Sequence, residues 1–122
     1  MKIAIPVDNK TLDTNICASF GRAPYFLVYD TETKESTFIE NTAATSPGGA
    51  GIKAAQMIVD NKAAALLTPR CGQNAADVLN AAGIKIYKTI AGSARDNIDA
   101  FTDGKLSLLD DFHAGFHGRR SN

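Results

Sequence analysis

The sequence has no excess of either charge, because its 13 basic residues balance its 13 acidic residues. A neutral chain has no general attraction for nucleic acid or for an anionic membrane, so we expect neither partner and only a local anion site. Cysteine is also scarce: there are two, and no Cys-x-x-Cys pair. That excludes a conventional zinc site and a cluster held by four protein thiolates. A metal–sulfur cluster would have to bring most of its own sulfide ligands.

Long hydrophobic runs are also lacking. No run approaches the length that spans a membrane, and the first one, at residues 3–7, is too short for a signal peptide. We therefore expect a cytoplasmic protein with reduced cysteines. The 122 residues fit one domain, and 44% of them are hydrophobic, which is enough for a core. We place one α/β domain at residues 1–106 and a polar C-terminal tail at residues 107–122.

The spacing of apolar residues predicts the element order β-β-β-α-β-α-β-α. The expected strands are residues 2–7, 24–30, 35–41, 63–68 and 84–87. The expected helices are residues 52–60, the stretch between Gly72 and Gly83, and a last helix from residue 94 onward.

The helix ends carry local signals. We expect Asn61 to end the first helix in the left-handed conformation, and Ile52, Ala55 and Val59 to share one face of it. Ser93, followed three residues later by an aspartate, predicts a capping box at the last helix.

The connections predict the topology. A turn of hairpin length at residues 31–34 makes the second and third strands antiparallel, and the later βαβ units require parallel strands with right-handed crossovers. The natural order is a five-stranded mixed sheet, 3-2-1-4-5, with strand two antiparallel. The loops at residues 8–23, 42–51, 69–72 and 88–92 then emerge at one edge, where such sheets bind ligands.

Candidate site residues gather in these loops. Cys17 lies in the first, Gly48, Gly49 and Gly51 in the second, and Arg70 and Cys71 in the third. Two helix N-termini point to the same edge and favour anions. A helix start and a neighbouring arginine both lower the pKa of a thiol, which favours the metal-binding thiolate of Cys71.

The residues alone leave simpler interpretations open. Either cysteine can be a small packed residue without chemistry, and a disulfide between them is a minor alternative. The glycine-rich stretch "TSPGGAG" lacks the Gly-Lys-Ser/Thr of a phosphate-binding loop and can be only a turn before a helix. His113 and His117 have helical spacing; they belong either to a solvated tail or to a clip that folds over a metal cargo.

Four segments together resemble the dinitrogenase iron–molybdenum cofactor biosynthesis family: "IAIPVD", "FGRAPYF", "GGAGIKAAQ" and "CGQNAADVLNAAGIKIY". The resemblance covers about residues 1–106. It implies a ribonuclease H-like three-layer fold and the binding or carrying of anionic metal–sulfur clusters rather than catalysis. Many members carry a histidine where this chain has Ser19, and Gly-Pro-Asn-Ala where it has Gly72-Gln73-Asn74-Ala75.

These observations predict a non-catalytic carrier of an iron- or molybdenum-containing cluster, with Cys71 as its primary thiolate. Arg22 and Arg70 would neutralise the charge of the cluster, and backbone N–H groups would donate to its sulfides. The remaining candidates are Gly48, Gly49, Gly51, Gly72 and Asn74 for the cargo, with Cys17, Ser19, His113 and His117 in second rank.

The alternative is a regulatory module that binds a small non-metal anion or a protein at the same edge. A ribonuclease H-type enzyme would need paired carboxylates, and the strand that precedes Arg70 offers none. We expect a monomer or a weak homodimer, with an ATPase or a cofactor-assembly protein as a possible partner.

Overall fold

The computed structural model describes residues 1–110 and residue 112. The elements follow the predicted order: β1 (Lys2–Val7), β2 (Tyr25–Asp30), β3 (Ser36–Glu40), α1 (Ala50–Asp60), β4 (Ala65–Thr68), α2 (Gln73–Ala81), β5 (Lys85–Lys88) and α3 (Ala94–Thr102). None of these helices is long and apolar enough to cross a membrane.

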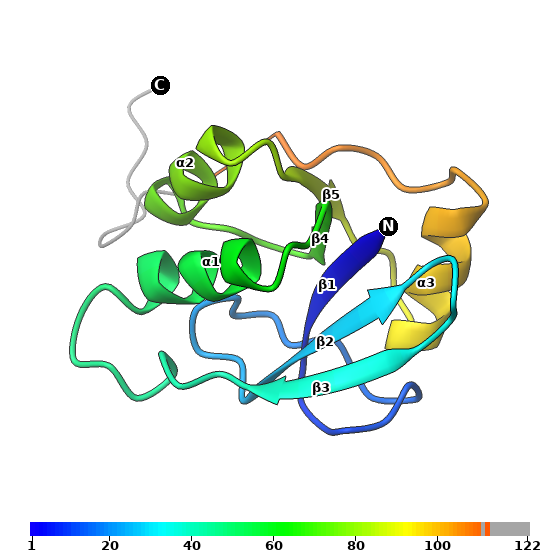
Figure 1. The fold of residues 1–122 in the computed structure, drawn as a ribbon, viewed down its shortest axis with the longest axis horizontal. Helices are drawn as coiled ribbons and strands as arrows, with labels where there is room; N and C mark the ends of the chain where they lie inside the picture. The colour runs from blue at the N-terminus through cyan, green and yellow to red at the C-terminus, as the bar shows by residue number, and fades with distance from the viewer. Residues whose placement is uncertain (111, 113–122) are drawn as a thin grey trace.

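The five strands form one mixed sheet in the order β3-β2-β1-β4-β5, which confirms the predicted topology. β2 is antiparallel to both β1 and β3, whereas β1, β4 and β5 run parallel. Figure 1 shows α1 and α2 side by side on one face of the sheet and α3 on the other. This three-layer arrangement is ribonuclease H-like.

The alternation of side chains along β1 builds two separate cores. Ile3 and Ile5 face α3, where they pack in a cluster that includes Ile98. Ala4 points to the opposite face and joins Leu66 in the cluster under α1 and α2. Because successive strand residues point to opposite faces, a strand covered on both sides must be apolar throughout, and β1 is buried from its second residue on.

The first helix differs from its prediction in two ways. It begins at Ala50 rather than residue 52, because Gly49 starts it in the left-handed conformation with a φ of 69°. Its buried residues include Ala54, Ala55 and Ile58, whereas Ile52, predicted to share a face with Ala55, is 44% exposed.

The predicted left-handed stop at Asn61 is wrong, since its φ is −87°. The Asn61 side-chain amide donates to the carbonyl oxygen of Met57 at 2.8 Å, and the left-handed residue is Lys62, with a φ of 61°. The capping box of α3 is confirmed: the Ser93 hydroxyl accepts from the Asp96 amide at 3.1 Å, and the Asp96 carboxylate accepts from the Ser93 amide at 3.0 Å.

The first residues of the predicted tail lie along the outer edge of β5. The Lys88 amide donates to the Ser107 carbonyl at 2.8 Å, and the Leu109 amide donates to the Ile86 carbonyl at 2.8 Å. Leu109 is buried in the core under α1 and α2. This segment covers a strand edge that would otherwise present unpaired backbone groups.

Candidate functional site

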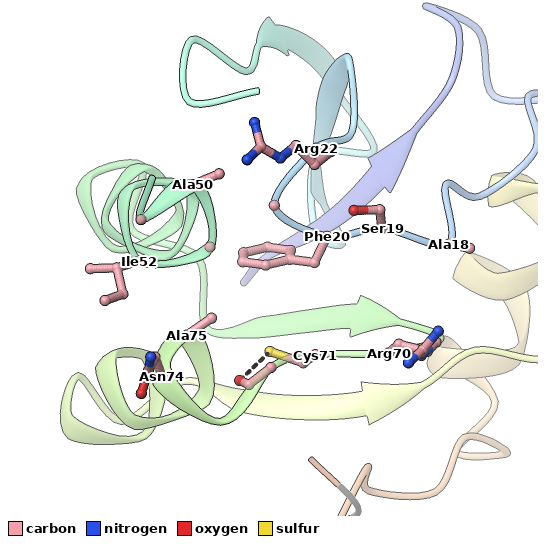
Figure 2. A pocket seen from close by; sticks show the side chains of 14 residues that line it. Ala18, Ser19, Phe20, Arg22, Ala50, Ile52, Arg70, Cys71, Asn74 and Ala75 are labelled. Atoms are coloured by element: carbon pink, nitrogen blue, oxygen red, sulfur yellow. Dashed lines mark hydrogen bonds between the residues drawn. The ribbon is translucent and has the colours of Figure 1, made fainter. Parts of the chain in front are cut away.

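A pocket of about 550 Å³ lies at the carboxyl edge of the sheet. Figure 2 shows that the loop after β1 and the loop after β4 meet the starts of α1 and α2 there. The lining comes from residues 18–22, 49–52, 70–72, 74 and 75. It includes most of the predicted site residues, namely Ser19, Arg22, Gly49, Gly51, Arg70, Cys71, Gly72 and Asn74.

The two helices that open onto this pocket lack side-chain caps. Neither Gly49 before α1 nor Gly72 before α2 supplies a side-chain acceptor, and the first turn of each helix contains no acidic residue. In contrast, α3 is closed by its capping box. The first-turn N–H groups of α1 and α2 therefore have no side-chain acceptor at their own caps, and such groups favour a negative charge.

The charged side chains of the lining are all positive. Arg22 and Arg70 both contribute, and no residue of the described lining is an aspartate or a glutamate. The chain as a whole is neutral. The positive character of this pocket lining is therefore local, as the neutral composition predicted.

The Cys71 thiol contradicts one prediction from the sequence. The residue is only 1% exposed, and its Sγ donates to the Gly72 carbonyl oxygen at 3.6 Å. Burial raises the pKa of this thiol to about 12 instead of lowering it. Desolvation outweighs the helix start, and Figure 2 shows the Arg70 side chain extending away from the sulfur, so the neighbouring cation offers little compensation.

Arg22 has a second task besides its charge. Its Nη1 donates to the Ala44 carbonyl at 2.8 Å and to the Ser46 carbonyl at 2.9 Å. The guanidinium thus ties the loop after β1 to the loop after β3, beside the start of α1. The sequence predicts only charge neutralisation for this arginine, and these two hydrogen bonds add a structural role.

The apolar lining of the pocket was missed by the sequence analysis. Phe20 is 3% exposed, lines the pocket and packs its ring against Phe26 with 5.3 Å between ring centroids. Ala50 and Ala75 add small apolar walls. The available signal was a phenylalanine inside a long loop, since an aromatic ring there needs a surface to cover.

Two candidates lie outside the pocket lining. Cys17 is half-buried, its amide donates to the Pro6 carbonyl at 2.9 Å, and burial is the main cause that raises the pKa of its thiol. It forms no disulfide with Cys71, as both thiols are free. Gly48 also does not line the pocket, because the helix starts only after Gly49.

The predicted histidine ligands cannot be placed, because His113 and His117 lie outside the described residues. Within residues 1–110 and residue 112, no three His, Cys, Asp or Glu side chains come together as a metal site. Cys71 is the one thiol of the described pocket lining.

Fold and pocket together define a small ribonuclease H-like α/β protein with a cationic pocket at the carboxyl edge of its sheet. The family model described as dinitrogenase iron–molybdenum cofactor matches residues 1–104, and the chain belongs to this family.

The solved structures that are similar to the chain include two with more than 30% identity to it. The apo form of the orange protein from Desulfovibrio gigas is 34% identical, with a TM-score of 0.85, over 88% of this chain and 92% of that one. A NifB-like protein from Thermotoga is 38% identical, with a TM-score of 0.80, over 91% of this chain and 95% of that one. A comparison of the chain with curated proteins found no match.

Proposed function

We propose that the chain is a non-catalytic carrier of an anionic metal–sulfur cluster that contains iron or molybdenum, held in the pocket described above. The composition of the pocket is the observation that supports this most directly: a buried thiol, two arginines and two helix starts without side-chain caps meet there, without a carboxylate in the described lining. The family description supports the class of cargo. The orange protein was solved in an apo form, which implies a group that it binds.

The pocket residues can bind a cluster through one covalent bond and several hydrogen bonds, which suits a cargo that is later released. Cys71 supplies the single thiolate, so the cluster must bring its other ligands. Sulfide ligands of the cluster accept hydrogen bonds from the first-turn N–H groups of α1 and α2, from Arg70 and from the Asn74 amide. One covalent bond and several hydrogen bonds hold a cluster less permanently than four thiolates do, and a carrier must release what it binds.

The same lining is poorly suited to catalysis. Proton transfer by an enzyme needs a positioned acid or base, usually a histidine or a carboxylate, and two-metal hydrolysis needs several carboxylates. The described lining contains neither type of group. A role in holding and delivering a cluster requires none.

One observation favours a second candidate. With a pKa of about 12, the Cys71 thiol stays protonated at neutral pH unless a metal displaces its proton. A small non-metal anion can therefore occupy the pocket without any bond to sulfur, and the chain would then be an anion-dependent regulatory module.

Elemental analysis with a visible spectrum separates the two candidates. Protein purified without oxygen is measured as isolated and after incubation with tetrathiomolybdate or with iron and sulfide. Cys71→Ala is the test variant. Cys17→Ala is its matched control, because the Cys17 thiol is partly buried nearby but does not line the pocket.

The carrier predicts molybdenum or iron, with sulfide, in the wild type and in Cys17→Ala, and its loss in Cys71→Ala. Metal bound equally by Cys71→Ala would show that the thiol is not the ligand. A wild type that takes up no metal under any of these conditions would leave the anion-dependent module.

A further inference from the structure

A buried asparagine outside the pocket makes hydrogen bonds to the loop after β1, which forms one wall of the pocket. Asn41 follows β3 directly and is 6% exposed. Its Nδ2 donates to the carbonyl oxygens of Gly21 at 3.1 Å and Ala23 at 2.9 Å, and its Oδ1 accepts from the Ala43 amide at 3.0 Å. The amide is therefore satisfied at both ends by backbone groups of two loops.

The Gly21 and Ala23 carbonyls belong to the residues on either side of Arg22 in the chain. Arg22 in turn makes hydrogen bonds from this loop to the loop after β3. Its Nη1 bonds the Ala44 and Ser46 carbonyls, which belong to the loop that follows Asn41. Asn41 thus bonds to the backbone on either side of Arg22, and Arg22 bonds to the backbone that follows Asn41. We call these five hydrogen bonds the reciprocal clasp.

The reciprocal clasp sets the position of the pocket wall against α1. A Cβ on Gly21 would lie 3.0 Å from the Gly51 amide nitrogen, so the wall already touches the first turn of the helix. That turn provides N–H groups to the pocket. A shift of the wall would change both the width of the pocket and the direction in which Arg22 presents its charge.

We propose that Asn41 is a positioning residue for the cargo, acting through Arg22 and Gly21 without contacting the cargo itself. This inference rests on the proposed function. Residues that orient a metal ligand change affinity by about 10–100-fold when they are replaced, and Asn41 orients the backbone beside a charged hydrogen-bond donor instead. The reciprocal clasp joins the loop after β1, which lines the pocket, to the loop that leads into α1, so we expect an effect at the lower end of this range.

A second buried asparagine in the chain provides a matched control. Asn97 on α3 is 0% exposed. Its Nδ2 donates to the carbonyls of Ile90 at 3.1 Å and Ser93 at 3.0 Å, and its Oδ1 accepts from the Ile90 amide at 2.8 Å. Like that of Asn41, its side-chain amide makes three hydrogen bonds to backbone groups, but neither Asn97 nor the loop that it contacts lines the pocket.

The test is an anaerobic titration with tetrathiomolybdate, followed by absorbance, on the wild type, Asn41→Ala and Asn97→Ala. Thermal unfolding of the same samples compares their stability. We expect the Kd to rise about tenfold or more in Asn41→Ala and to stay within about twofold in Asn97→Ala, although both lose stability. If Asn41→Ala does not fold, Asn41→Ser is measured against Asn97→Ser.

Three results would overturn the inference or its basis, and they are distinguishable. A wild type that takes up neither tetrathiomolybdate nor iron with sulfide contradicts the proposed function itself. If it takes up only iron with sulfide, the two asparagine variants are compared with that probe. A wild type that binds, with an unchanged Kd in the Asn41 variant, contradicts only the positioning role. Equal weakening in both asparagine variants would show that lost stability, not the position of the wall, controls the affinity.

Discussion

The protonated state of Cys71 makes a sharp prediction about pH. If the Cys71 sulfur adds to a metal of the cargo without displacing one of its sulfides, the S–H bond is the one that breaks, and its proton is released to the buffer. With a pKa of about 12, only about one thiol in 10⁵ is ionised at pH 7. The Kd for tetrathiomolybdate should therefore fall about tenfold for each pH unit throughout the range from pH 7 to pH 10.

The upper end of this range distinguishes the buried thiol from an ordinary one. A thiol with the usual pKa of 9.0 would be half ionised at pH 9, so its affinity would rise only about twofold between pH 9 and pH 10. The buried thiol should still give about tenfold there. Arginine stays charged across these pH values and adds no slope of its own.

Calorimetric titration in buffers of different ionisation enthalpy measures both quantities, the Kd and the number of protons released. We expect one proton for each molecule bound by the wild type and none for Cys71→Ala. A Kd that does not depend on pH, with no proton released, would refute a thiolate bond. The same slope in Cys71→Ala would assign the proton to another group.

Three further predictions concern stability and charge. Because the pKa of Cys71 is raised in the folded state, the free energy of unfolding should fall above pH 9 by about 1.4 kcal/mol per pH unit. Urea titrations at several pH values should show a shallower fall in Cys71→Ala. Gly49→Ala should lower the free energy of unfolding by about 1–2 kcal/mol, because its φ is 69°, whereas Gly48→Ala, whose added Cβ meets nothing within 4 Å, should be nearly neutral in the same assay. Arg70→Ala should raise the Kd for tetrathiomolybdate about tenfold at low salt and reduce its salt dependence, while Arg95→Ala, which removes only the surface pair with Asp13, should leave binding unchanged.

The sequence by itself determined the order of the elements and the order of the strands. Both follow from local patterns: the apolar alternation of β1, the hairpin turn after β2, and crossovers that have only one favourable hand. The capping box at Ser93 was equally readable, because its partners are three residues apart. This local information was also enough to bring Arg22, Arg70 and Cys71 to one edge of the sheet.

Only the tertiary structure decided the chemical state of that edge. The pKa of Cys71 depends on how deeply its sulfur is buried, which the sequence does not state. Arg70 is its neighbour in the sequence, but only the structure shows that the arginine side chain extends away from the sulfur. The bonds of Arg22 to Ala44 and of Asn41 to Gly21 join residues about twenty positions apart, for which no local pattern exists. Local propensity fixes the backbone path, whereas burial and long-range hydrogen bonds exist only after the loops have met.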